Sequence, residues 1–143
     1  MKRPFYMGFL AALALCACAP DTPGAKAARD RHARMEEMGD AMDALGDESK
    51  KAAPDVSLMS KNALIIADLA ESLPAWFPAG SGPQDGVKTK AKADVWTNSM
   101  SFQDQAHDMR SVANDGADAI TAQISDVGRT CKACHDQFRE KKD

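Results

Sequence analysis

The stretch that decides the fold lies near the C-terminus, where residues 120–138 read ITAQISDVGRTCKACHDQF. Apolar residues and cysteines recur in it at alternating spacings of three and four, which predicts a helix with one buried stripe. The stripe consists of Ile120, Ile124, Val127, Cys131, Cys134 and Phe138. We therefore expect the two cysteines to face the interior of the fold.

The same stretch contains a C-x-x-C-H motif made of Cys131, Cys134 and His135. Two thiols three residues apart on a helix can add to the two vinyl groups of one haem, and the adjacent imidazole can bind its iron. Zinc binding would need a fourth ligand, and the remaining histidines, His32 and His107, do not have zinc-ligand spacing to the motif. A redox disulfide is the other alternative, although the βαβ setting typical of such pairs is missing. We expect covalently bound haem c.

Three more stretches upstream carry the same alternating spacing of apolar residues, so the sequence predicts four helices. Their stripes are Met35, Met38, Met42 and Leu45; then Val56, Met59, Ala63, Ile66, Ala70 and Leu73; then Val95, Ser99, Phe102, Ala106, Met109 and Ala113. No stretch alternates apolar and polar residues as a strand does.

The breaks between these stripes predict the connections. Residues 49–55 contain a proline, and residues 74–86 are rich in proline and glycine and form one long crossover. Residues 114–116, Asn-Asp-Gly, are expected to form a tight turn between the last two helices. The fold class predicted is all-α, an antiparallel four-helix bundle with one long crossover loop.

The first residues are typical of a secretory signal, because Lys2 and Arg3 precede an apolar run shorter than the roughly 20 residues of a transmembrane helix. Residues 15–18, Leu-Cys-Ala-Cys, resemble a bacterial lipoprotein box, with cleavage before Cys18 and lipid on its sulfur. Cleavage after Ala19 is the alternative. We expect a lipoprotein-type signal peptide at 1–17, a tether at 18–28 and the folded domain at 29–143.

Charge and composition exclude some classes of function. Removal of the signal peptide leaves 16 basic and 21 acidic residues, a net charge of −5, which does not suit nucleic-acid binding. No Ser/His/Asp set or pair of carboxylates stands out, so we do not expect an enzyme.

Four segments together resemble the class II cytochromes c, which include the cytochromes c′. They are the Arg31-x-x-x-Met35-x-x-x-Gly39 pattern, LPAWFPAGS at 73–81, KAKADVW at 90–96 followed by Phe102, and VGRTCKACHDQFR at 127–139. The resemblance covers nearly the whole mature domain. It implies a periplasmic monohaem protein whose redox partner the sequence does not name.

By this resemblance His135 is the proximal iron ligand, Met35 occupies the distal position, Arg31 pairs with a haem propionate and Arg139 lies in the proximal pocket. Two functions follow. Met35 as sixth ligand implies an electron carrier, the reading we favour at this point. If Met35 only packs on the haem, the iron is five-coordinate and can bind nitric oxide or carbon monoxide. His32 is interpreted as solvated rather than as a ligand. Class II relatives often form homodimers through their first two helices.

Overall fold

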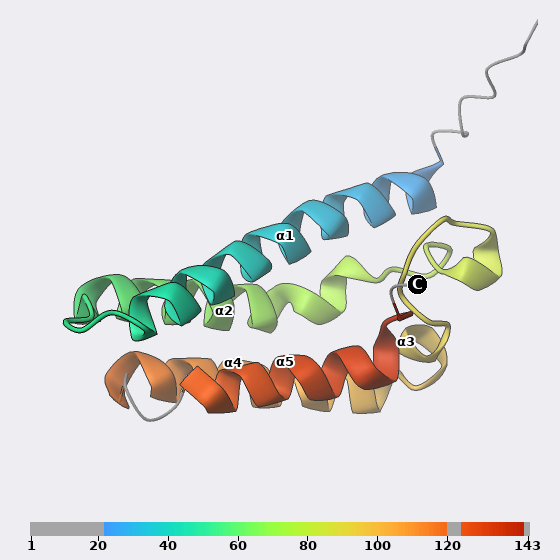
Figure 1. The fold of residues 1–143 in the computed structure, drawn as a ribbon. Helices are drawn as coiled ribbons and strands as arrows, with labels where there is room; N and C mark the ends of the chain where they lie inside the picture. The colour runs from blue at the N-terminus through green and yellow to red at the C-terminus, as the bar shows by residue number, and fades with distance from the viewer. Residues whose placement is uncertain (1–21, 120–123, 142–143) are drawn as a thin grey trace, which may run out of the picture.

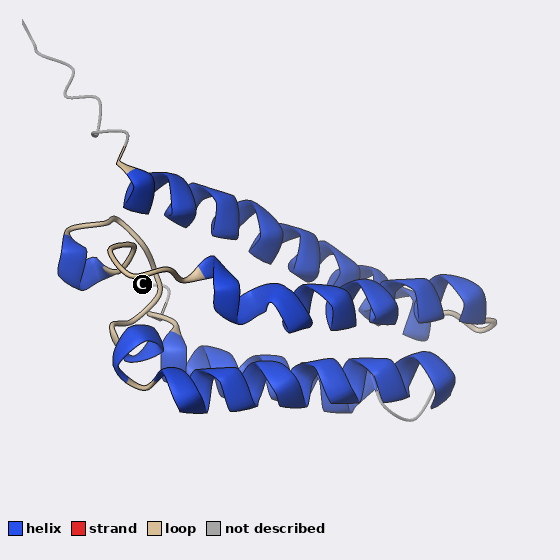
Figure 2. Cartoon of the chain, turned by 180° about the vertical axis from the view of Figure 1, so that it is seen from behind, coloured by secondary structure: helices blue, strands red, loops and turns tan. Residues whose placement is uncertain are grey.

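The computed structural model describes residues 22–119 and 124–141, which are helical with no strand (Figure 2). The elements in order are α1 (Pro23–Ser49), α2 (Val56–Ser72), η1 (Leu73–Trp76), η2 (Pro83–Asp85), α3 (Asp94–Thr97), α4 (Ser99–Ala119) and α5 (Ile124–Phe138). Four long helices form the predicted bundle, and the crossover between α2 and α4 is at one end of it (Figure 1). The predicted fold class is confirmed. None of the described helices is long and apolar enough to span a bilayer.

Helix α1 begins earlier than the sequence suggested, because residues 23–28 are helical although we expected a tether there. The side chain of Thr22 accepts a hydrogen bond from the backbone N–H of Ala25 at 3.1 Å and caps the helix. Pro23 follows at the first helical position, where its missing N–H costs nothing. The remainder of the predicted tether and the signal peptide lie outside the described residues.

The turn predicted at residues 114–116 is wrong, because α4 continues through them to Ala119. A glycine inside a helix costs only about 1 kcal/mol relative to alanine, which the continued backbone hydrogen bonding can offset. The connection to α5 therefore falls at residues 120–123, outside the described residues, together with Ile120 of the predicted stripe. At the other end of α4, a break at Asn98 separates the short α3 from the long helix.

The bundle is built around α2 and α4, which pack closely on each other, with α1 against α2 and α5 against α4. The core draws residues from all four long helices, including Leu45 of α1, Ile66 of α2, Ala113 of α4 and Val127 of α5. By contrast, α1 and α5 contact each other little. Figure 1 shows them running in opposite directions and diverging toward the crossover end of the molecule.

Candidate haem-binding site

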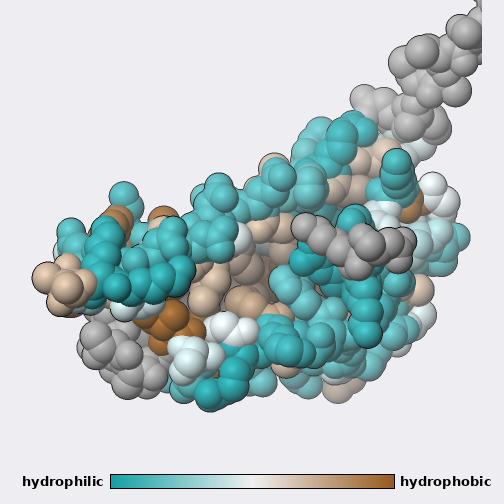
Figure 3. Space-filling model, in the orientation of Figure 1, coloured by the Kyte–Doolittle hydropathy of each residue, from teal (hydrophilic) through white to brown (hydrophobic). Residues whose placement is uncertain are grey.

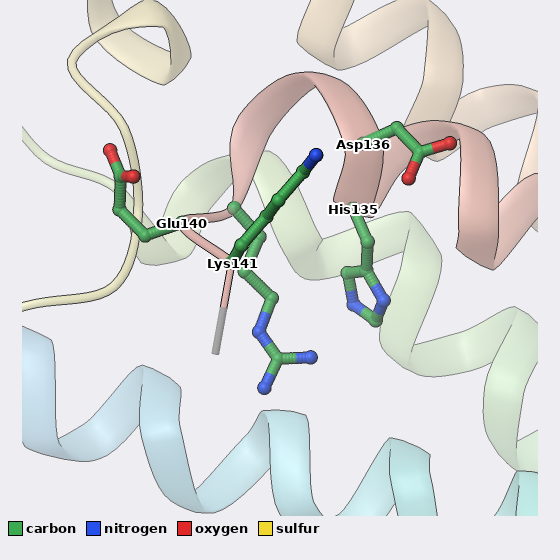
Figure 4. Close-up of a pocket in the computed structure, with 5 residues that line it drawn as sticks. His135, Asp136, Glu140 and Lys141 are labelled. Atoms are coloured by element: carbon green, nitrogen blue, oxygen red, sulfur yellow. The ribbon is translucent and has the colours of Figure 1, made fainter. Parts of the chain in front are cut away.

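The C-x-x-C-H motif lies on the last two turns of α5, on the side that faces α1. Cys131 and Cys134 are free thiols, partly buried and packed against the hydrophobic core. The Sγ of Cys131 is 3.8 Å from the Sδ of Met109, which anchors this part of α5 to α4. His135 is solvent-accessible, and its ring points from α5 toward α1 (Figure 4). The predicted placement of the cysteines on a buried stripe is confirmed.

The imidazole of His135 opens into a pocket of about 160 Å³, lined by His135, Asp136, Arg139, Glu140 and Lys141. Cys131 and Cys134 lie beyond this pocket, toward the middle of the bundle. There, apolar side chains line a hollow between α1 and α5 (Figure 3). The partly buried apolar residues against the core include Met35 and Met42 of α1. The site is thus an apolar hollow with one imidazole and two thiols on its α5 side.

The electrostatics of the site shift the pKa values of the motif residues. Burial raises the pKa of the Cys131 thiol, and burial together with the neighbouring Cys131 raises the pKa of Cys134 to about 11. Burial, and then the charge of Arg139, lowers the pKa of His135. Its ring is neutral at pH 7 and has a nitrogen lone pair for a metal.

One of the few places where α1 and α5 approach each other indicates which of their residues lie opposite. A Cβ built on Gly128 of α5 would lie 3.7 Å from the Cε of Met42 on α1. The two helices are antiparallel, and both rise about 1.5 Å per residue. Counting seven residues, or about 10 Å, from this point along both helices leads to Met35 of α1 and His135 of α5. Because the helices diverge over this distance, a flat group can lie between the two side chains.

The same count leads to Arg31 and Arg139, one turn beyond Met35 and His135. Arg31 is 4% exposed, and its guanidinium donates hydrogen bonds to the Oγ and the backbone carbonyl of Ser81 at 2.9 and 2.7 Å. It also stacks over the rings of Phe77 and Trp96, at 5.0 and 5.4 Å from their centroids. Sequence reasoning missed Ser81, whose only signal was its position in the 73–81 segment.

No described residue forms an ion pair with Arg31, and burial without a compensating charge lowers the pKa of its guanidinium. A buried charge is costly unless an opposite charge accompanies it. The two propionates of a haem would supply negative charge at this level of the site. Together with the neutral imidazole and the two thiols, the uncompensated Arg31 shows that these residues fit a haem.

An aromatic chain connects the crossover to the two helices on the proximal side. The ring of Phe102 lies 4.9 Å from that of Phe77 and 5.1 Å from that of Phe138, and Phe77 also lies 5.6 Å from Trp96, all edge to face. Through these contacts Trp96, Phe77 and Phe102 anchor the crossover to the core. They also explain how the crossover is held where Arg31 reaches Ser81.

The remaining histidines lie outside the site. His32 is exposed and pairs with Glu36 at 3.4 Å, one turn away on the same helix. His107 is exposed on α4, in a shallow groove between α2 and α4. Among the described residues, no group of three or more His, Cys, Asp or Glu side chains is arranged to hold a metal ion. The zinc alternative therefore gains no fourth ligand from the described part of the chain.

The family model for cytochrome c′ matches residues 26–139, which includes both sides of this site. The chain is 33% identical to cytochrome c′ of Rhodospirillum rubrum, over 97% of this chain and 99% of that protein. The solved structure of cytochrome c′ from Rhodopseudomonas palustris superimposes with a TM-score of 0.72 at 31% identity, covering 82% of this chain and 98% of that one. The protein is a haem-binding c-type cytochrome by fold and motif. It belongs to the cytochrome c′ family, and its cofactor is haem c.

Two further relatives bear on function. A nitric oxide complex of a variant cytochrome c′ from Alcaligenes xylosoxidans has a TM-score of 0.71 at 25% identity, covering 83% of this chain and 97% of that one. A cytochrome c-556 from Agrobacterium tumefaciens is 29% identical over 79% of this chain and 94% of its own length. The family therefore extends beyond proteins named cytochrome c′.

Proposed function

We propose that this protein binds a small diatomic gas, nitric oxide or carbon monoxide, on the distal face of a haem held between α1 and α5. Cys131 and Cys134 hold the cofactor through thioether bonds, and His135 is the proximal iron ligand. When bound, the haem supplies an iron coordination site for the gas. The observation that carries the proposal is membership of the cytochrome c′ family, together with the nitric oxide complex of a structural relative.

The residues around the haem have distinct tasks in this proposal. Met35 covers the distal face with an apolar side chain, which admits a small uncharged gas and restricts water. Arg31 pairs with a propionate from its fixed position on Ser81. Arg139, level with Arg31 on the proximal side, adds positive charge near His135. No step of this proposal requires an acid–base or nucleophilic residue.

Electron transfer is the second candidate, the one we favoured from the sequence alone. The thioether of Met35 favours electron transfer. A methionine and a histidine together are the iron ligands typical of electron-carrying cytochromes. In that case Met35 would be the sixth iron ligand rather than a packing residue. Both candidates use the same cysteines and the same histidine, and they differ only at Met35.

Absorption spectra of the reduced protein, with and without carbon monoxide, separate the two candidates. Five-coordinate iron predicts a high-spin spectrum and rapid carbon monoxide binding, whereas Met35 ligation predicts a low-spin spectrum and slow binding. Met35→Ala should speed gas binding without changing the spin state in the first case, and should convert low-spin to high-spin in the second. Met100→Ala is the control, since it removes a solvent-exposed thioether on α4. A low-spin wild-type protein would refute the gas-binding proposal.

We also propose that the protein is exported to the periplasm and anchored by lipid at Cys18. The features that support this are the basic start, the short apolar run and the lipoprotein-like box of residues 15–18. Mass spectrometry of the mature protein tests it, because a diacylglyceryl group on Cys18 adds a characteristic mass. A mature chain that begins at Pro20 would refute the lipid anchor but would still agree with export to the periplasm.

Self-association is a separate proposal. A structural relative, 26% identical with a TM-score of 0.65, is described as a cytochrome c′ with ligand-controlled dimer dissociation. We expect a homodimer whose stability changes when gas binds, measurable by sedimentation with and without carbon monoxide. A single monomeric species at all concentrations would exclude it.

A further inference from the structure

Two basic segments, far apart in the sequence, are joined at the end of the molecule where His135 lies. Residues 88–92 include Lys88, Lys90 and Lys92, with no acidic residue between Asp85 and Asp94. The backbone N–H of Lys92 donates to the carbonyl of Phe138 at 2.9 Å, and the N–H of Glu140 donates to the carbonyl of Lys90 at 2.8 Å. These bonds hold the lysine segment beside the C-terminal end of α5.

We define the basic end as Lys88, Lys90, Lys92, Arg139 and Lys141. Lys88, Lys90 and Lys141 are exposed, while Lys92 and Arg139 are half-buried. Four acidic residues of the described chain lie in or beside these segments. Asp85 and Asp94 flank the lysines in the sequence, Asp136 is paired with Lys132, and Glu140 is exposed in the pocket that also contains His135. The five basic residues of the basic end outnumber the three carboxylates that Lys132 does not pair, although the whole chain is acidic.

The opposite end of the bundle also carries charged residues of both signs, and there Lys50 and Lys51 pair with Asp47 and Glu48. The second half of α1 contains Asp40, Asp43, Asp47 and Glu48, and Asp55 caps the start of α2. In Figure 1 this end lies at the far left, and the crossover and the C-terminus lie at the right. The basic end thus lies at the same end of the bundle as the haem motif.

The composition of the basic end favours a protein partner over a lipid surface. Peripheral helices that bind membranes combine basic residues with apolar side chains that enter the bilayer. The large apolar side chains exposed in the described part of the chain are Val56, Leu58, Leu64 and Met100. Three of these lie on α2, and none belongs to the two basic segments.

We infer that the basic end is the docking surface for an acidic redox protein that exchanges electrons with the haem. The inference rests on the proposed function, and it applies to both candidates. Carbon monoxide binds only reduced iron, so for that gas a donor must supply one electron to the oxidised protein. Complementary charge steers such partners into contact at rates that fall with ionic strength. The basic end brings the acidic face of the partner to the edge of the site at His135.

Oxidation of the reduced, haem-loaded full-length protein by two small reagents of opposite charge tests the local field. One electron passes from the protein to ferricyanide, which becomes ferrocyanide, or to tris(phenanthroline)cobalt(III), which becomes cobalt(II). We expect the ferricyanide rate to fall, and the cobalt rate to rise, as ionic strength increases from about 10 to about 200 mM. The net negative charge of the chain acting alone predicts the reverse. The reverse result would overturn the inference.

Charge reversal locates the surface. Lys88→Glu with Lys90→Glu should lower the ferricyanide rate on the order of tenfold at about 10 mM ionic strength, and little at high salt. The matched control is Lys50→Glu with Lys61→Glu, which makes the same change of net charge with exposed lysines of the α1–α2 loop and α2. Equal effects of the two pairs would show that only net charge matters and would refute a docking surface.

A direct binding measurement identifies the class of partner. We expect decaglutamate to shift the NMR signals of residues 88–92 and 139–141 in the wild-type protein and not in the Lys88→Glu/Lys90→Glu variant. Co-sedimentation with phosphatidylglycerol vesicles at physiological salt, lost in the same variant, would assign the surface to lipid and overturn a protein partner. The absorption spectrum reports haem loading and spin state separately, so failure of the proposed function is distinguishable from failure of the docking surface.

Discussion

Gly24→Ala tests how closely the first turn of α1 is pressed against the crossover that positions Arg31. A Cβ built on Gly24 would lie 2.0 Å from the carbonyl oxygen of Gly80 and 3.2 Å from a methyl group of Val87. Real Cβ atoms do not approach a backbone oxygen so closely, so α1 or the crossover must move by more than 1 Å. Gly80 itself has φ +80°, which disfavours a side chain there and limits how the loop can adjust.

The expected cost follows from these distances. Overpacking a well-fitted contact costs about 1–3 kcal/mol, and the gain in helix propensity from alanine is below about 1 kcal/mol. We therefore expect Gly24→Ala to lower the free energy of unfolding by about 1–2 kcal/mol, a fall in Tm of roughly 3–8 °C. Because Gly80 directly precedes Ser81, the displaced loop should also weaken the two hydrogen bonds from Arg31 and loosen the propionate side of the haem.

Thermal unfolding, monitored by far-UV circular dichroism, measures the stability of the variant. The rate of carbon monoxide binding measures the effect on the haem site. Gly46→Ala is the matched control, because a Cβ there meets nothing within 4 Å on the interior of the same helix. We expect it to raise the free energy of unfolding by up to about 1 kcal/mol. Equal stabilisation by both substitutions would show that α1 does not press on the crossover, and would refute the reasoning.

Two further predictions concern stability. The buried Nε1 of Trp76 has no hydrogen-bond partner among the described residues, whereas that of Trp96 donates to a crossover carbonyl at 3.0 Å. In chemical denaturation, Trp76→Phe should therefore be near neutral and Trp96→Phe should cost about 1 kcal/mol; the opposite order would contradict this. The carboxylate of Glu48 pairs with Lys51 and accepts the backbone N–H of Asp55 at 2.6 Å, which lowers its pKa below 4.5. The ionised Glu48 carboxylate therefore stabilises the fold at neutral pH, and this stabilisation is lost as the pH falls through the lowered pKa of Glu48. Below pH 4.5, Tm should thus drop more steeply in the wild-type protein than in Glu48→Gln. Parallel Tm curves would exclude this role.

Local patterns in the sequence predicted most of the helical architecture. The alternating apolar stripes identify the helices because a helix that packs on a core must bury one face. Most of the α2 stripe is buried, including Ile66, but Val56 at its start is 55% exposed. In α5 the stripe residues Val127 and Phe138 are buried, and the two cysteines are partly buried. Where local signals conflicted, prediction failed. Asn114-Asp115-Gly116 has turn composition, but α4 continues through it, and Pro23 reads as part of a tether although it opens α1.

The C-x-x-C-H motif is the part of the site that the sequence by itself determined, because Cys131, Cys134 and His135 are neighbours on one helix and need no tertiary contact to be recognised. Only the tertiary structure decided what faces them. The approach of Met42 to Gly128 indicates the register that leads to Met35 and His135, and such a register depends on packing between helices far apart in the chain. Likewise, the burial of Arg31 on Ser81 without a counter-charge depends on the path of the crossover. The distal side of the haem is therefore a property of the fold, whereas its attachment is a property of the motif.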